Sequence, residues 1–525
     1  VLLLSFFIFG SLCHSLPLST NKRWIIDDDS GERVKLTCVN WAAHLQPMLA
    51  EGLDKKPLSE IVAKVADNKF NCVRLTWATY MFTRYGLLNV TDTLESLGLW
   101  AAREGIEMNN PEVLTMTLVQ AYDTVVDELG RQGLMVVLDN HVSKPKWCCP
   151  YDDGNGFFRD LHFNPLEWQI GLIMVSTRYR IRPQVVAMSM RNELRGSLQN
   201  EHDWYLYIRR GAKLVHLANP DMLVVVSGLS WALDLEFLKT KPLALSLDHK
   251  LVYEAHWYSF SIDPLIWVVQ PLNRVCGRVY KSLNEHAGFV MSGKTPVPLF
   301  LSEFGFDQRG LSLPDNQFLS CLMAYATEKD LDWGLWALQG SYYTKGLLPG
   351  PEEPFGLLDK NWDRLRYPKF RKRFHLMQKM IKDPNSNYTK AKIIFHPQSG
   401  SCVHAYNKTQ IITRNCSTWS RWSHDGDGSP MVLIGSGLCL KVVGDGQAPI
   451  LSRDCLSQQS AWKTVSMSKL HLAAKDEQGE LLCLQKEPFS SSRILTRRCI
   501  CIQDDSGCLL NPQSQWFKYI TTNIK

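Results

Sequence analysis

Between residues 34 and 340 the chain alternates short β-branched runs with longer helix-like stretches. This alternation predicts βα units built around a parallel sheet. Eight segments are predicted to be strands: 34–41, 71–77, 134–141, 185–193, 223–228, 251–258, 298–305 and 332–338. Because eight strands that are each followed by a helix can close on themselves, we expect a (β/α)8 barrel over 20–384. An open doubly wound sheet is the alternative.

The segments between these strands carry helical periodicity. Residues 59–68 place Ile61, Val62 and Val65 on one face. Pro111 is expected to open a helix whose apolar positions recur at helical spacing up to Leu129. An amphipathic helix over 363–381 is expected to end the barrel.

Composition and the first residues indicate export. The chain has 525 residues, too many for one ordinary domain, and its 45% hydrophobic and 21% charged residues are typical of a globular protein. Its net charge of +6 comes without a dense basic run, so no nucleic-acid partner is expected. The apolar start is too short to cross a membrane and is interpreted as a truncated signal peptide over 1–16, with a buried strand as the alternative.

Cysteines and glycosylation sequons agree with that interpretation. There are 15 cysteines, and disulfides persist in oxidising compartments. Four Asn-x-Ser/Thr sequons begin at Asn89, Asn387, Asn407 and Asn415. We therefore expect a secreted, extracellular or cell-wall protein that has no membrane partner and is a monomer.

Beyond a linker at 385–390 the composition changes, and the region 391–522 repeats itself three times. Each unit has two cysteines followed by a tryptophan: Cys402, Cys416 and Trp422; Cys439, Cys455 and Trp462; Cys483, Cys499 and Trp516. A repeat of this length indicates units that share one core. In each unit the cysteine pair can staple a hairpin-like loop around the tryptophan. Cys501 and Cys508, in an insertion of the third unit, are expected to bond to each other.

These repeats resemble the ricin B-type β-trefoil lectin module, which implies an all-β domain with pseudo-threefold symmetry. The chain departs from that family two residues before each tryptophan, where Ser420, Ser460 and Ser514 replace glutamine. Asp445 is a candidate sugar-binding residue. A glycan ligand on the trefoil and a purely structural appendage both remain open.

Two acidic residues stand at the ends of predicted barrel strands. Glu193 closes the run 185–193, and Glu303 lies near the end of 298–305. Either could be a salt-bridge partner if it stood alone. Cleaving an acetal between sugars needs a proton for the leaving oxygen and an electron-rich partner for the anomeric carbon, and two carboxyl groups supply both. The pair therefore predicts a glycosidase.

Other polar and aromatic residues also fall at the predicted strand ends: Trp41, Arg74, His141, Asn192, His256, Tyr258 and Trp336. Each alone has a structural explanation, such as an ion pair or core packing. Together with Glu193 and Glu303 they resemble glycoside hydrolase family 5, the cellulase and mannanase family of (β/α)8 enzymes. The resemblance extends over about 350 residues and includes Arg on strand two, His on three, Asn-Glu on four, His-x-Tyr on six, Glu on seven and Trp on eight.

The resemblance implies roles for these residues. Glu303 would be the nucleophile, kept charged by Arg74 and hydrogen-bonded by Tyr258, and Glu193 the acid/base group that starts protonated. Asn192 would bind the sugar 2-hydroxyl. His141 and His256 would wall the cleavage subsite, Trp336 would be its stacking floor, and Trp41 a further platform. Retention of configuration is implied, without a metal or an organic cofactor.

The loop 144–156 after strand three is expected to wall one side of the cleft. Its adjacent Cys148 and Cys149 have no second pair at metal-ligand spacing, so a disulfide is favoured, with Cys276 or another barrel cysteine as a candidate partner.

The expected substrate is a β-1,4-linked glucan or mannan, or an oligosaccharide derived from one. A transglycosylase and a carbohydrate-binding protein of low activity are the alternatives. A glycolipid-cleaving enzyme would need a broad apolar cleft.

Overall fold

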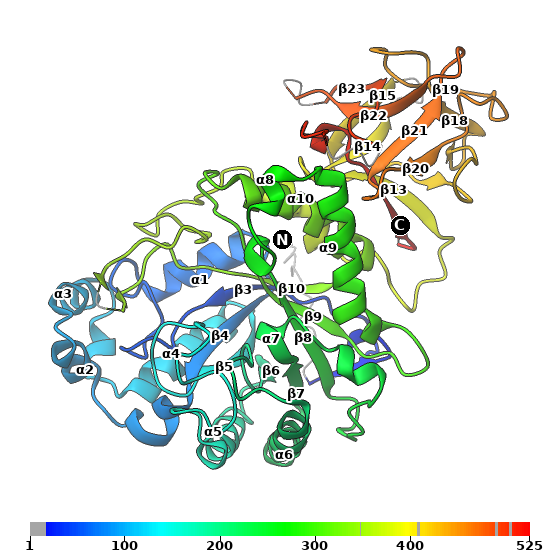
Figure 1. Ribbon diagram of the computed structural model, residues 1–525. Helices are drawn as coiled ribbons and strands as arrows, with labels where there is room; N and C mark the ends of the chain where they lie inside the picture. Colours follow the sequence, from blue (N-terminus) through cyan, green and yellow to red (C-terminus); the bar gives the residue numbers. More distant parts are fainter. Residues whose placement is uncertain (1–16, 347, 407–409, 489–491, 503–506, 525) are drawn as a thin grey trace, which may run out of the picture.

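The computed structural model describes residues 17–346, 348–406, 410–488, 492–502 and 507–524. Its larger part is a closed barrel of eight parallel strands in the order β10-β3-β4-β5-β6-β7-β8-β9 (Figure 1). The strands are β3 (Thr37–Trp41), β4 (Cys72–Ala78), β5 (Met135–Val142), β6 (Val185–Ser189), β7 (Leu223–Ser227), β8 (Leu251–Trp257), β9 (Leu299–Phe304) and β10 (Asp332–Leu335). The predicted (β/α)8 barrel is confirmed, and the open sheet is wrong.

The N-terminal end of the barrel is closed by a hairpin of β1 (Leu18–Asn21) and β2 (Trp24–Asp27). Leu18 packs into the same buried cluster as side chains inside the barrel, such as Val137 and Val225. The backbone amide of Thr20 donates to the carbonyl of His249 at 2.7 Å. Because this end is plugged, a ligand has access from the opposite, C-terminal ends of the strands.

Helices surround the barrel: α1 (Leu58–Asp67), α2 (Val90–Ser96), α3 (Trp100–Asn109), α4 (Leu118–Arg131), α5 (Pro165–Arg178), α6 (Glu201–Ala218), α7 (Leu229–Ala232), α8 (Ile266–Val269), α9 (Leu272–His286), α10 (Leu313–Lys329) and α11 (Phe370–Gln378). The helix expected to open at Pro111 begins instead at Leu118, because Thr117 and Gln120 form a capping box. Likewise α11 is shorter than the predicted 363–381. Pro368 disfavours helix in the residue before it, and Lys379 is extended.

A buried ion cluster joins the ends of the barrel sequence. The carboxylate of Asp330, just after α10, pairs with Arg33 and with Lys35, whose Nζ lies 2.7 Å away. It also accepts hydrogen bonds from the backbone amides of Ile381 and Lys382 at 3.0 and 2.7 Å. The cluster thus ties the segment that leads into the first barrel strand to the segment that leaves the barrel.

Residues 391–522 form an antiparallel all-β region. Its strands are β13 (Ala391–His396), β14 (Ser401–Tyr406), β15 (Gln410–Asn415), β16 (Trp422–Ser423), β17 (Val432–Leu433), β18 (Leu438–Lys441), β19 (Ile450–Ser452), β20 (Lys463–Val465), β21 (His471–Lys475), β22 (Leu481–Lys486), β23 (Ile494–Arg498) and β24 (Lys518–Thr522). Disulfides join Cys402 to Cys416, Cys439 to Cys455, Cys483 to Cys499 and Cys501 to Cys508, the pairs expected from the repeats.

The repeated tryptophans divide between two cores. Trp422 and Trp462 are buried in the centre of the all-β region. Trp516 is buried in the large cluster that continues into the barrel, and its indole donates to Oδ1 of Asn273 on α9 at 2.9 Å. Lys518 of β24 pairs with Glu328 of α10 at 3.2 Å. The all-β region is therefore packed against α9 and α10, and not held by the linker alone.

The barrel cysteines pair locally. Cys38 bonds to Cys72, its neighbour across β3 and β4. Cys276 on α9 bonds to Cys321 on α10, and Cys148 bonds to Cys149. Cys276 as a candidate disulfide partner of the loop cysteines is wrong, because α9 and α10 pack against each other and bring Cys276 to Cys321.

Only some of the features that indicate export lie within the described residues. The proposed signal peptide and Asn407 lie outside them. Asn387 and Asn415 are exposed, whereas Asn89 is half-buried and its side-chain oxygen caps α2 through the amide of Thr91. Among the described residues, no helix combines the length and apolarity needed to cross a bilayer.

Candidate active site

The two predicted carboxylates meet at the C-terminal end of the barrel. Glu303 lies on β9, and Glu193 follows β6, which ends at Ser189 and not at residue 193 as predicted. The backbone of Glu193 takes a φ of 43°, an uncommon conformation for a residue other than glycine. One carboxylate oxygen of each and a ring nitrogen of His256 lie within 4.8 Å of one another. The sequence pair is thus a spatial pair.

Arg74 on β4 holds Glu303 and the residue that precedes Glu193. Its guanidinium donates to Oε1 of Glu303 at 2.6 Å and to Oδ1 of Asn192 at 3.0 Å. Asn192 precedes Glu193, and its backbone amide is held by the carbonyl of Asn140 at 2.9 Å. One buried guanidinium therefore orients the carboxylate and the amide together.

Further acidic groups surround Arg74 below the cleft. Asp139 Oδ1 lies 2.9 Å and Glu254 Oε2 3.6 Å from the guanidinium, and all three side chains are buried. Burial alone would lower the pKa of Arg74, but Asp139, Glu254 and Glu303 outweigh it and raise that pKa. Arg74 is thus a fixed positive charge.

Glu303 is 4% exposed and hydrogen-bonded on both oxygens. Tyr258 donates its hydroxyl to Oε2 at 2.9 Å, and burial raises the pKa of that hydroxyl well above its usual value, so it remains a donor. Burial also raises the pKa of the Glu303 carboxyl, while the positive charges of His256 and Arg74 oppose the rise.

His256 on β8 links the acidic residues. Its Nδ1 lies 2.9 Å from Oε1 of Glu193 and 3.8 Å from Oε2 of Glu303, and its Nε2 lies 3.0 Å from Oγ of Ser302. Burial alone would lower the pKa of His256, but Glu303 and Glu193 outweigh it and raise that pKa.

His141 and Trp336 form another part of the wall. Their rings stack with centroids 5.5 Å apart, and Nδ1 of His141 lies 2.6 Å from Oδ2 of Asp139. Burial and the charge of Arg74 lower the pKa of His141 well below its usual value, so its ring is neutral. Both residues line the cleft.

Trp41 does not reach the cleft, so its expected role as a platform is wrong. It is 0% exposed, and its Nε1 donates to the carbonyl of Glu51 at 2.9 Å. Neighbouring strand residues point to opposite faces. Asn40 contacts Arg74 inside the barrel, so Trp41 points outward into the helix-facing core.

Sequence reasoning missed several members of the site: Asn40, Asp139, Glu254 and Ser302. A signal existed for two of them. Asp139 and Glu254 precede His141 and His256 by two residues, and alternate residues of a strand share a face.

The site opens into a cleft of about 680 Å³, whose lining includes His141, Glu193, His256, Glu303 and Trp336. This size is typical of ligand sites. Part of its wall is aromatic: Trp147, Trp231, Tyr258, Phe260, Trp336 and Phe355. Tyr258 and Phe260 stack with centroids 4.7 Å apart, and Phe355 lies parallel to them. Flat rings beside paired carboxylates suit the apolar faces and hydroxyl groups of sugars.

The same acidic and histidine side chains are of the kinds that bind metals, as in the group Asp139, His141 and Glu303. The guanidinium of Arg74 lies within 3 Å of both carboxylates of that group. A permanent positive charge at this distance opposes a cation, so this donor set fits an arginine-centred site better than a metal centre.

Comparison with known proteins agrees with this geometry. The family model described as Cellulase (glycosyl hydrolase family 5) matches residues 28–341. A glycosyl hydrolase 5 family protein of Chamaecyparis obtusa is 44% identical, over 97% of this chain and 94% of that protein. The major extracellular endoglucanase of Xanthomonas campestris pv. campestris is 23% identical, over 66% and 69%.

Solved structures share the barrel. One is an endocellulase from Pyrococcus horikoshii in complex with cellotetraose, with 18% identity, a TM-score of 0.56, and coverage of 69% of this chain and 99% of that one. At this identity the likeness concerns the fold. The family model and the relative from Chamaecyparis obtusa show that the chain belongs to glycosyl hydrolase family 5 and is a glycoside hydrolase.

Proposed function

We propose that the protein is a secreted retaining β-glycosidase that hydrolyses β-1,4-linked glucan or mannan chains by double displacement. The observation that carries the proposal is that carboxylate oxygens of Glu193 and Glu303 lie within 4.8 Å of each other. Retaining enzymes hold their two carboxyl groups about 5 to 5.5 Å apart, whereas inverting enzymes leave room for a water between them.

In the first step Glu303 attacks the anomeric carbon while Glu193 gives its proton to the leaving oxygen. Arg74 and the Tyr258 hydroxyl orient the attacking carboxylate. In the second step Glu193 takes a proton from water, which cleaves the glycosyl ester and frees Glu303. Because burial raises the pKa of Glu303, activity should fall as pH drops through that pKa and the nucleophile becomes protonated.

Asn192 is suited to the sugar 2-hydroxyl. Its Oδ1 accepts from Arg74, which leaves its Nδ2, beside Nε2 of His141 and Sγ of Cys149, as the donor for that hydroxyl. Such a bond strengthens as charge develops at the neighbouring anomeric carbon. His141 and Trp336 would form the wall of this subsite.

The aromatic residues of the cleft and the relatives support the proposed substrate class. Cellotetraose, the ligand of the archaeal endocellulase, is a β-1,4-linked glucan fragment. Secretion is supported by disulfides throughout the described part of the chain, including Cys38–Cys72 and Cys402–Cys416. Binding of a glycan by the all-β region remains a separate proposal, which retention of residues 391–525 on immobilised glycans would test.

The test is a panel of β-linked glucans, mannans and xylans incubated with wild type, Glu303→Ala and, as a control, Glu236→Ala. Glu236 is a partly exposed residue away from the cleft lining. We expect released reducing ends with wild type and Glu236→Ala only, and a first-formed product that keeps the β configuration by NMR. Activity that survives in Glu303→Ala would refute the nucleophile, and lengthened oligosaccharides in place of reducing ends would indicate a transglycosylase.

A further inference from the structure

A disulfide between adjacent residues forms part of the catalytic cleft. Cys148 and Cys149, in the loop after β5, are bonded to each other, and both line the cleft together with Glu193 and Glu303. A bond between neighbouring residues closes a small ring and restricts the loop backbone. Its sulfur atoms also present an apolar, polarizable surface. The double displacement described above uses neither property.

The sulfur atoms contact the residue that would bind the sugar 2-hydroxyl. Nδ2 of Asn192 lies 3.5 Å from Sγ of Cys149 and 3.8 Å from Sγ of Cys148. Oδ1 of Asn192 accepts from Arg74, and a guanidinium can only donate. The amide therefore has one orientation, with its NH2 group toward the disulfide and toward Nε2 of His141, 3.5 Å away.

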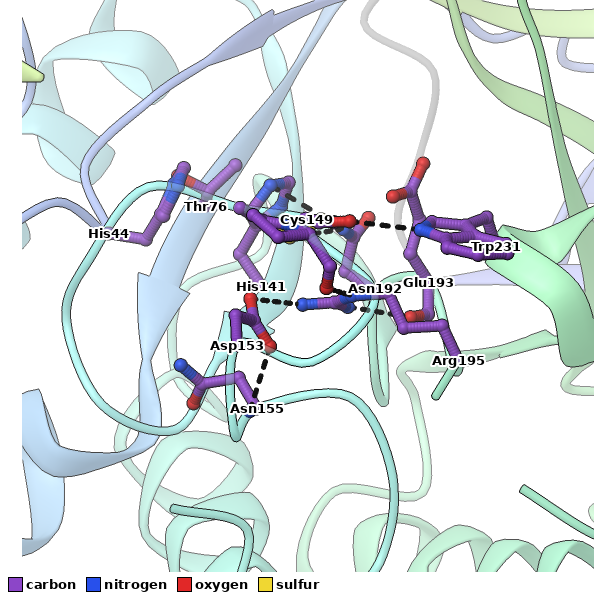
Figure 2. Close-up of a disulfide and its surroundings, with 12 residues drawn as sticks. His44, Thr76, His141, Cys149, Asp153, Asn155, Asn192, Glu193, Arg195 and Trp231 are labelled. Carbon is purple, nitrogen blue, oxygen red and sulfur yellow. Dashed lines mark hydrogen bonds and ion pairs between the residues drawn. A yellow bond between two sulfur atoms is a disulfide. The ribbon is translucent and has the colours of Figure 1, made fainter. Parts of the chain in front are cut away.

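The loop that carries the disulfide is anchored on both sides (Figure 2). The indole Nε1 of Trp231 donates to the carbonyl of Cys149 at 2.9 Å. Nε of Arg195 donates to the carbonyl of Pro150 at 2.9 Å, and the same guanidinium pairs with Asp153 at 2.5 Å. Arg195 follows Glu193 by two residues. The disulfide is thus connected to the backbone that carries the acid/base residue.

Trp231 extends the same wall. Its side chain is partly exposed and lines the cleft with Cys149 and Glu193. Glu193 is the proposed donor to the leaving oxygen, so a wall that includes Glu193 lies on the side where the departing part of the substrate is expected. An indole beside a disulfide offers a continuous apolar surface for the C–H face of a sugar ring.

We propose that the Cys148–Cys149 disulfide is a positioning element of the active site, which holds the Asn192 amide toward the sugar 2-hydroxyl and, with Trp231, contacts the leaving-group sugar. This inference rests on the proposed function. It assigns the substrate-facing role to the closed disulfide and not to the cysteines as separate thiols.

The test compares wild type with Cys148→Ser/Cys149→Ser on a β-linked oligosaccharide. An error of about 1 Å in a positioning group costs on the order of 100-fold in rate, so we expect kcat to fall about 10- to 100-fold with a smaller change in KM. Cys439→Ser/Cys455→Ser opens a disulfide in the all-β region and is the matched control, with an expected change below about twofold. Equal kcat and KM in the cleft variant and wild type would overturn the proposal.

A substrate change separates positioning from a general loss of structure. With a 2-deoxy glycoside carrying the same leaving group, Asn192 has no 2-hydroxyl to bind. The cleft variant should then differ from wild type by less than with the parent glycoside. An undiminished loss on the 2-deoxy substrate would refute action through Asn192.

If the double variant unfolds below the assay temperature, Trp231→Phe tests the proposal in its place. This substitution keeps an aromatic ring in the wall, but removes the donor to Cys149 and part of the indole surface. We expect a smaller loss in the same direction, again reduced on the 2-deoxy substrate, and no loss would refute the proposal. Inactive wild type on every glycan would refute the proposed function instead, since the inference concerns only ratios between active enzymes.

Discussion

The guanidinium of Arg74 lies 2.6 Å from Oε1 of Glu303 and makes its other contacts within the same buried group. Its planar fork meets a carboxylate, an amide oxygen and a second carboxylate at once. A lysine ammonium is a single point charge and cannot reproduce that set. The site is therefore organised around the shape of arginine as much as around its charge.

Arg74→Lys should lower kcat about 100-fold, because both Glu303 and Asn192 lose their common anchor and misplacement of reacting groups by about 1 Å has that effect. Steady-state kinetics on a β-linked oligosaccharide measures it. Arg84→Lys, at an exposed ion pair with Glu167, is the control and should be neutral. A kcat for Arg74→Lys within twofold of wild type would contradict the anchoring role.

Glu193→Gln should show its role through the leaving group. Glutamine cannot give up a proton, so we expect kcat/KM for an oligosaccharide to fall about 10²- to 10⁴-fold. A dinitrophenyl glycoside has a leaving group that departs without protonation, and its glycosylation step should be affected far less. Equal losses on both substrates would argue against Glu193 as the general acid.

The barrel could be predicted from sequence because its strands are short apolar runs buried on both faces. Each predicted strand overlaps an observed one, and the main errors lie at ends, as at 185–193. The gathering of polar residues at the C-terminal strand ends could also be predicted, since these ends converge on one face of a barrel. The position of Trp41 was predicted wrongly because a strand end alone does not say whether a side chain points into the barrel or outward. The neighbouring Asn40 points inward to Arg74, so Trp41 must point outward.

The pairing of Cys148 with Cys149 could not be predicted, because spacing along the chain does not say which of 15 cysteines meet in space. The contact of Trp516 with Asn273 could not be predicted from the spacing of residues along the chain either. The repeats indicate a shared core but not which tryptophan faces another domain.

Asp139 should make stability depend on pH. Burial raises its pKa to about 6, with Arg74 and His256 opposing the rise, against about 3.9 in an unfolded chain. The folded protein therefore binds a proton that the unfolded chain has released. The contribution of this proton to the free energy of unfolding is fully present below about pH 4. It is lost as pH rises through 6, and the loss is on the order of 3 kcal/mol.

Thermal unfolding of Asp139→Asn across pH 4 to 7 tests this, and its Tm should fall less over that range than that of wild type. Asp332, whose pKa burial also raises to about 6, lies at the start of β10. Asp332→Asn should flatten the stability profile in the same way while leaving the activity profile unchanged. Parallel Tm curves for wild type and both variants would contradict the assignment.

Asp330→Ala should be among the most destabilising single changes, because it leaves Arg33 and Lys35 buried without their carboxylate. Breaking a buried pair in this way costs about 3 to 5 kcal/mol. Asp363→Ala removes a surface partner of Lys56 and should cost less than about 1 kcal/mol. Denaturant unfolding at pH 7 compares the two, and similar losses would contradict the buried cluster's role.

The pH dependence of the difference in free energy of unfolding between wild type and Asp330→Ala gives an independent check. Burial alone would raise the pKa of Asp330, but Lys35 and Arg33 outweigh it and lower that pKa far below its unfolded value. The stabilisation is therefore present above the unfolded pKa of about 3.9 and is lost as pH falls below it. The gap in free energy of unfolding between wild type and Asp330→Ala should stay constant from pH 7 to 5 and narrow below pH 4. A gap that widens toward acid pH would show that Asp330 does not act through its charge.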